Sequence, residues 1–189
     1  IITIRGVPHV VGGLDAGEEQ HARITVGVAV DIGVPAQGVD SGCGIGKAVA
    51  VLIHILWIAH LVGIGMNEIL TYPLVSISDL EVTGSLMQHN PLKVSNPMND
   101  NLQYLRTDLR SSILKVLSEN RRFFHTDPIR LFEVGRAYIS NIDPTKLPEE
   151  RLLLTGVLSG PRLNETWLAA SNQFNFFDGK GLIKTIFSK

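Results

Sequence analysis

The longest apolar stretch of the chain runs from Ala48 to Met66 and reads AVAVLIHILWIAHLVGIGM. When it is drawn as a helix, apolar side chains occupy every face, and only His54, His60 and two late glycines interrupt them. About 18 apolar residues also suffice to cross a bilayer, so the pattern predicts one long helix that is either buried in protein or facing a membrane. The internal histidines and the weakly charged flanks favour the buried alternative.

Around this segment the pattern changes to short runs separated by turns. Residues 1–47 are rich in glycine and in brief Val/Ile runs, which predicts short strands. After Met66, residues 69–76 (ILTYPLVS) are expected to form an edge strand or the start of one, and residues 77–90 a short helix and loop. Residues 91–97 (PLKVSNP) are expected to form another strand, and residues 101–107 a further extended piece.

The clearest helix in the pattern covers residues 108–122. Thr107 is expected to cap it, Asp108 lies in its first turn and basic residues lie in its last. One face carries an apolar stripe at the helical period, made of Leu109, Ile113, Val116 and Leu117.

The basic residues of this helix fall into two pairs on a wheel of about 100° per residue. Arg110 and Arg121 lie within about 20° of each other beside the apolar stripe, whereas Lys115 and Arg122 point away from it. Three interpretations stay open. The arginines can be a solvated edge, the stripe with its arginines can pack on a partner subunit, or the outer pair can contact RNA phosphates.

The rest of the chain predicts an α+β fold with antiparallel strands. Residues 129–139 (IRLFEVGRAYI) and 151–160 (RLLLTGVLSG) read as two neighbouring strands joined by a turn-rich segment. A last helix is expected to begin at Asp178. It turns inward the apolar residues Leu182, Ile183, Ile186 and Phe187.

Composition and motifs narrow the chemistry. Seventeen basic and 18 acidic residues give a net charge of -1, so any RNA contact must be local, and the single Cys43 cannot form an internal disulfide. The turn at residues 42–47 (GCGIGK) suggests a small nucleotide-binding enzyme, but Ser41 and Ala48 depart from the phosphate-loop spacing. The six histidines show no chelating spacing, which argues against a metal site. No Ser, His and Asp constellation comes with a nucleophile elbow and Cys43 has no evident base partner, so nucleophilic catalysis is not indicated.

Five segments in order resemble one family. GMNEILTYPLVS, NPMNDNLQYLRTDLRSSILKVLSENRRF, IRLFEVGRAY, RLLLTGVLSG and FNFFDGKGLIK are similar to the synthetase-like core of bacterial phenylalanyl-tRNA synthetase β subunits. The resemblance implies an antiparallel sheet with flanking helices, of the class II aminoacyl-tRNA synthetase kind, preceded by a partial β-rich remnant. It divides the chain into residues 1–47, resembling the editing module, the apolar helix 48–66, and a core at 67–189 that is truncated at its C-terminus.

The resemblance also implies a function. The chain would be a non-catalytic β subunit, or a fragment of one, that packs against the catalytic α subunit in a cytoplasmic α2β2 enzyme charging phenylalanine tRNA. ATP and magnesium would serve the whole enzyme, and this chain would bind no cofactor itself. The site residues expected at the subunit interface or on RNA are Arg110, Ile113, Lys115, Leu117, Arg121 and Arg122.

The sequence departs from the family in two places. Gly27 stands where the editing module is expected to carry a glutamate, and the helical module with magnesium-binding carboxylates has no counterpart before GMNEI. The chain is therefore expected to be a natural fragment, a degenerate product or a rearranged one. Two alternatives stay open: a membrane-anchored protein through residues 48–66, and the nucleotide-binding enzyme through residues 42–47.

Overall fold

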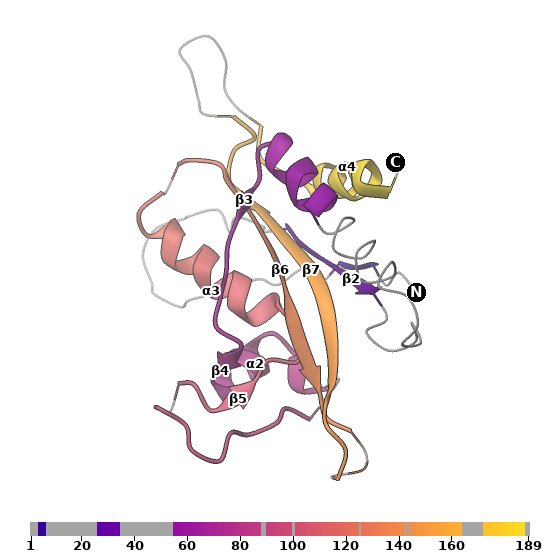
Figure 1. The fold of residues 1–189 in the computed structure, drawn as a ribbon. Coiled ribbons are helices and arrows are strands. Elements are labelled where there is room, and N and C mark those ends of the chain that lie inside the picture. The colour runs from indigo at the N-terminus through magenta and orange to yellow at the C-terminus, as the bar shows by residue number, and fades with distance from the viewer. Residues whose placement is uncertain are drawn as a thin grey trace, which may run out of the picture.

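A five-stranded sheet with the strand order β1-β2-β7-β6-β3 forms the centre of the protein (Figure 1). The computed structural model describes residues 4–6, 26–34, 55–87, 90–99, 101–124, 126–141, 143, 145–163 and 172–187. Neighbouring strands are antiparallel except β3 and β6, which are parallel. The strands are β1 (Ile4–Gly6), β2 (Val26–Val34), β3 (Asn67–Glu68), β6 (Ile129–Ile139) and β7 (Glu149–Ser159). Helices flank a mainly antiparallel sheet, so the mixed α+β class predicted from the sequence is confirmed.

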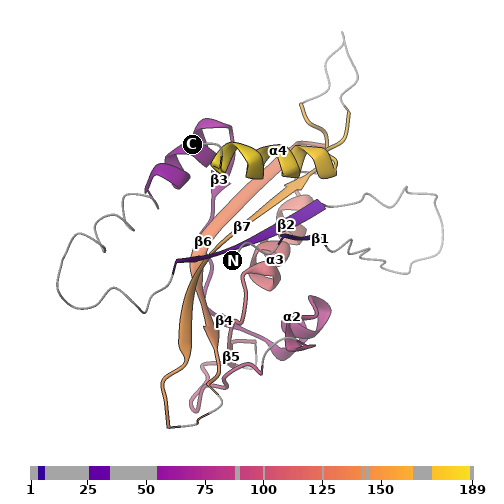
Figure 2. The same ribbon diagram turned by 90° about the vertical axis from the view of Figure 1, so that its right-hand side faces the viewer.

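The β6–β7 hairpin is the backbone of this sheet. Its register runs from Ile129 opposite Ser159 to Ile139 opposite Glu149, as expected for two antiparallel neighbours. Because successive side chains of a strand point to opposite faces, each strand contributes to two cores. Figure 2 shows the hairpin extending past β2 at its far end, where the last β2–β7 pair is Val34 opposite Leu152.

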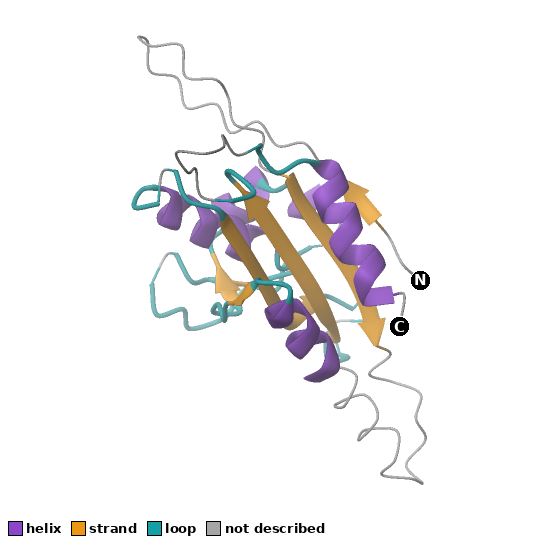
Figure 3. Cartoon of the chain, turned by 90° about the horizontal axis from the view of Figure 1, so that it is seen from above, coloured by secondary structure: helices purple, strands orange, loops and turns teal. Residues whose placement is uncertain are grey.

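One face of the sheet is covered by helical residues 55–63 and by α4 (Phe176–Phe187). They bury a core built from Leu61, Met66, Phe132, Leu154 and Leu158. The first helix ends in a Schellman motif, because Gly65 has φ +87° and the Met66 N–H donates to the Leu61 carbonyl at 3.0 Å. Figure 3 shows helices on both sides of the strands.

The other face of the sheet is covered by α3 (Arg110–Arg121), which packs on β6 and β7. Ile113 and Leu117 are buried there against Leu131 and Val157. Below α3 lie the two-stranded sheet of β4 (Leu74–Val75) and β5 (Tyr104–Leu105), the short α2 (Ile77–Val82) and a 3-10 turn at Ser85–Met87. The short helix expected within residues 77–90 is confirmed, and a capping box at Ser76 starts it.

The structure corrects three local predictions. Thr107 does not cap α3, because the helix begins at Arg110 and the Thr107 hydroxyl has no hydrogen-bond partner among the described residues. Instead, the Asp108 carboxylate accepts from the Arg110 N–H at 2.9 Å. Residues 91–97 contribute only a bridge from Lys93 to Tyr104, and residues 69–76 only the short β4. Proline in both segments shortens the strands, since it lacks the N–H that a ladder needs.

The apolar segment 48–66 is described only from residue 55 onward, and its helix ends at residue 63. In the described part of the chain, none of the helices combines the length and the apolar character that crossing a membrane requires. Residues 42–47, the possible nucleotide-binding turn, lie outside the described residues.

Candidate functional site

A buried ion pair joins the segment before α3 to the middle of β6. Arg106 follows β5 directly, and Glu133 lies at the centre of β6. The Arg106 Nη1 atom lies 2.8 Å from Glu133 Oε1, and the two side chains are 4% and 1% exposed. Charges buried this completely are tolerated only when each has its hydrogen-bond partners.

Thr71 and main-chain groups complete the pairing. The Thr71 hydroxyl lies 2.8 Å from Glu133 Oε2, to which it donates, and it accepts from Arg106 Nη1 at 2.7 Å. Arg106 Nε donates to the Arg136 carbonyl at 2.8 Å. These contacts connect three segments distant in sequence, so the ion pair, Thr71 and the Arg136 carbonyl are called the Arg106–Glu133 cluster below.

Main-chain hydrogen bonds hold the same three segments together. The Arg106 N–H donates to the Pro73 carbonyl at 2.9 Å, and the Tyr138 N–H donates to the Arg106 carbonyl at 2.9 Å. The chain at Arg106 is thus tied on one side to the residues around Thr71 and on the other to the end of β6. The cluster positions these segments on the sheet.

Gly135 makes the space for the guanidinium. A Cβ atom built on Gly135 would lie 2.4 Å from Arg106 Nη2 and 3.1 Å from Leu109 Cδ2. Real Cβ atoms do not approach other atoms so closely, so a larger residue would displace Arg106. In the FEVG segment, Glu133 therefore supplies the counter-charge and Gly135 the room.

Sequence reasoning did not single out Thr71, Arg106 or Glu133. The available signal was a charge in an apolar run, since Glu133 interrupts LFEVG and Arg106 follows YL. Charged residues in such positions are rarely buried without a partner. The pattern could have predicted that each residue needed a partner, but not which one.

Two predicted site residues, Ile113 and Leu117, are used by the protein's own core. They are 2% and 5% exposed and pack on β6 and β7. Arg110, beside them, donates from Nε and Nη2 to Asp108 Oδ2 at 2.9 and 2.6 Å. Its guanidinium is thereby held against the chain's own carboxylate.

Arg121 closes the other end of α3. Its Nη2 donates to Ser159 Oγ at 2.9 Å, and its Nη1 donates to the carbonyls of Phe124 and Asp127 at 2.7 and 2.8 Å. Gly160, with φ +89°, lies directly beneath, and a Cβ there would be 2.2 Å from Arg121 Nη2. Arg121 thus fastens α3 to the end of β7.

The outer pair of predicted residues stays on the surface. Lys115 is exposed and lies 3.4 Å from Asp79 Oδ2, and Arg122 is exposed just past the end of α3. Their contact with RNA or a partner stays a prediction. Gly27 lies in β2 opposite Val157, which places the expected editing position within the central sheet.

In the part of the chain that the structure describes, no group of three or more His, Cys, Asp or Glu side chains could hold a metal ion. The described surface does offer a pocket at the start of β6, lined by Gly65, Asn67, Pro128, Arg130 and Leu163. It lies away from the Arg106–Glu133 cluster, which is closed and internal.

Comparison with known proteins decides the family. Residues 56–189 match the family model described as the phenylalanyl tRNA synthetase beta chain CLM domain, which is more than half of the chain. The chain belongs to this family. The resemblance of five ordered segments to phenylalanyl-tRNA synthetase β subunits is thereby confirmed, and all three side chains of the Arg106–Glu133 cluster lie within the matched region.

The chain matches only a small part of each relative that carries the same family name. The phenylalanine–tRNA ligase beta subunit of Dehalococcoides mccartyi (strain CBDB1) is 34% identical over 127 residues, which is 67% of this chain and 15% of that protein. The beta subunit of Aster yellows witches'-broom phytoplasma is 35% identical over 130 residues, 68% of this chain and 14% of that protein. This chain therefore spans about one seventh of the length of the curated relatives that it matches.

A solved structure shares the fold. A prolyl-tRNA synthetase from Giardia lamblia, solved in complex with prolyl-adenylate, superimposes with a TM-score of 0.51 at 14% identity. The superposition covers 77% of this chain and 30% of that one. At this identity the likeness concerns the arrangement of the sheet and its helices and no residue of the site.

Proposed function

We propose that this chain is a non-catalytic β component, or a fragment of one, of phenylalanine–tRNA ligase and that it works by packing against the catalytic α subunit. The observation that carries the proposal is the family match over residues 56–189. In the proposed cytoplasmic α2β2 assembly, ATP and magnesium serve the whole enzyme, and phenylalanine tRNA meets this chain through the complex. The fold likeness to a prolyl-tRNA synthetase supports a class II synthetase-like core.

The domain division proposed with this function keeps residues 67–189 as the core and residues 48–66 as the helix leading into it. Residues 1–47 are proposed as the remnant of an editing module. The family match begins at residue 56, within the helix, and β2 pairs with β7 of the core. The N-terminal segment thus also contributes strands to the central sheet.

A structural role is supported by how the charged residues of the matching segments are used. Arg106 and Glu133 neutralise each other inside the protein, and Arg121 bonds to Ser159 and to two carbonyls. Side chains held in this way fix the fold and do not reach a substrate in this conformation. We therefore expect no phenylalanine-dependent ATP–pyrophosphate exchange from the isolated chain, and robust exchange would contradict the non-catalytic assignment.

The partner surface that the structure favours is the outer face of helical residues 55–63. Ile55, Leu56 and Val62 are each more than half exposed on this helix. On its other side the same helix packs Ile58 and Leu61 against the sheet. Exposed apolar side chains on one helix face are typical of an interaction site. The apolar stripe of α3 is occupied by the chain's own core, and of the residues predicted on α3 only Lys115, which pairs with Asp79, and Arg122 are exposed.

Association with a catalytic α subunit of a related bacterium tests the proposal. We expect co-purification of the two chains and a loss of affinity of about tenfold or more in the Leu56→Asp/Val62→Asp variant, because buried apolar anchors dominate such interfaces. The Lys115→Ala/Arg122→Ala variant tests the competing α3 surface and should bind like the parent chain if residues 55–63 form the interface. Loss of binding only in this α3 variant would move the interface to α3, and no association of the parent chain would refute the proposed function.

A further inference from the structure

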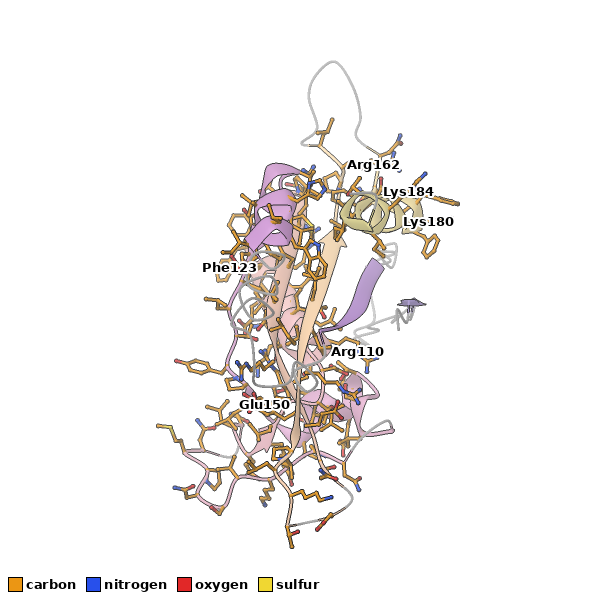
Figure 4. The ribbon with its side chains drawn as sticks, turned by 45° about the vertical axis from the view of Figure 1, so that its right-hand side comes forward. Arg110, Phe123, Glu150, Arg162, Lys180 and Lys184 are labelled. Carbon is orange, nitrogen blue, oxygen red and sulfur yellow. The ribbon has the colours of Figure 1, made fainter. Side chains whose placement is uncertain are left out.

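The outward face of α4 carries an unusual combination of aromatic and basic side chains. On a wheel of about 100° per residue, Phe177, Lys180 and Lys184 lie within about 60° of one another. On the same wheel they lie at least about 120° from Leu182 and Ile186, which line the cavity between α4 and the sheet. Figure 4 shows both lysines beside α4, at the same end of the molecule as Arg162. We call Phe177, Lys180 and Lys184 the α4 stripe.

Among the residues that the structure describes, none neutralises the lysines of the α4 stripe. Asp178 is the only acidic residue of α4, and its carboxylate is occupied by Arg162 at 3.0 Å and by the Asn175 N–H at 2.7 Å. Neither Lys180 nor Lys184 forms a salt bridge with any residue that the structure describes. Because the net charge of the chain is -1, such a local concentration of lysine is the kind of RNA contact its composition allows.

An exposed aromatic ring accompanies the lysines. Phe177 is 72% exposed, and its ring meets the half-exposed Phe176 edge to face with centroids 5.8 Å apart. Leaving two phenylalanines in water on one helical turn is unfavourable, and their rings offer a surface on which a planar base can stack. Aromatic rings combined with neighbouring cations are the chemistry by which proteins bind single-stranded nucleic acid.

We propose that the α4 stripe binds an unpaired segment of RNA, with Lys180 and Lys184 on consecutive phosphates and a base stacked on Phe177. The proposal rests on the proposed function, which supplies an RNA partner. Beyond that function, the proposal names α4 as the element that contacts the RNA and states that the bound RNA segment is single-stranded. Double-stranded RNA offers phosphates but no free base face, so it should bind less tightly.

Fluorescence anisotropy with the 189-residue chain and a labelled 12-nucleotide oligouridylate tests this contact. The Lys180→Ala/Lys184→Ala variant should bind about tenfold more weakly at low salt, and its salt slope should fall by about 1.4, the value for two phosphates of a single strand. Phe177→Ala should weaken binding at least about fivefold without changing the slope, and Phe177→Trp should retain affinity. Lys→Ala changes favour the helix, so these variants are expected to fold.

The Lys93→Ala/Lys146→Ala variant removes the same charge from two exposed positions outside any predicted site and is the matched control. Parent-like binding by the control, together with weaker binding by both α4 variants, supports the proposal. Equal loss in the control, unchanged binding by the α4 variants, or equal affinity for a 12-base-pair duplex overturns it. The outcome is separable from the proposed function, because association with the catalytic subunit is measured without RNA.

Discussion

The Arg106–Glu133 cluster predicts that removing one of its two charges destabilises the fold more than the loss of a single contact would. Glu133→Ala deletes the carboxylate but leaves the Arg106 guanidinium 4% exposed and without its counter-charge. Breaking a buried pair in this way costs about 3–5 kcal/mol, which is a large share of the about 5–15 kcal/mol that stabilises a typical domain. Thr71 would also lose the acceptor for its hydroxyl, which adds to the cost.

Urea unfolding, followed by circular dichroism and tryptophan fluorescence, measures this cost. The matched control is Glu150→Ala on β7, whose partner Arg136 lies on β6 in an ion pair exposed to solvent. Exposed pairs contribute about 0–1 kcal/mol, so the control should unfold near the parent midpoint.

A double-mutant cycle separates pairing from simple loss of contacts. In Arg106→Met/Glu133→Ala no unpaired charge remains, so the double variant should be more stable than the sum of the two single losses predicts, by about 1–3 kcal/mol. A Glu133→Ala cost below about 1 kcal/mol, or strict additivity, would refute the interpretation of the cluster as a coupled buried pair.

Three further predictions concern other parts of the fold. Gly160→Ala should destabilise the protein by about 2 kcal/mol or more in urea unfolding, because φ +89° is strained for alanine and the new Cβ meets Arg121; a cost under 0.5 kcal/mol would contradict this. Hydrogen bonds from the Thr145 hydroxyl, then from its N–H, lower the pKa of Asp143 below 3.8, so NMR titration should find an upward shift in Thr145→Val. Because the pKa of Asp143 is lower in the folded than in the unfolded state, its ionised carboxylate stabilises the turn above about pH 4, and this stabilisation is lost as the pH falls through the folded-state pKa. An unchanged titration in the variant would exclude the hydrogen bond from the Thr145 hydroxyl. Ile113→Ala should cost about 2–5 kcal/mol as a core truncation, and a parent-like midpoint would show that the side chain is not in the core.

The sequence predicted the elements whose signal is local. Strands were expected at residues 129–139 and 151–160 on either side of a turn-rich joint; they form at Ile129–Ile139 and Glu149–Ser159 and pair antiparallel, as expected. Likewise α3 was expected at residues 108–122 and forms at Arg110–Arg121, because its apolar stripe repeats at the helical period. Each of these predictions depends on residues close together in the chain.

The Arg106–Glu133 cluster could not be predicted in the same way. Thr71 and Glu133 are 62 residues apart, and Arg106 and Glu133 are 27 apart. Their meeting depends on the sheet order and on the path of the chain through β4 and β5. A wheel for α3 likewise shows which face is apolar but not whether that face packs on the chain's own sheet or on another subunit.

Two arginines near the ends of α3, Arg106 and Arg121, show how this ambiguity is resolved in three dimensions. Arg106 precedes α3 and lies over Gly135, while Arg121 ends α3 and lies over Gly160. In both places an arginine occupies the volume that a side chain on the hairpin would need, and it bonds to groups of the hairpin, the Arg136 carbonyl and Ser159. The helix is therefore fixed at both ends by an arginine over a glycine, with the apolar stripe buried between them. Of the two arginines that flank the stripe, Arg121 bonds over Gly160 and Arg110 bonds to Asp108, so the basic flank beside this apolar face is an internal fastening and is not by itself evidence of an interface.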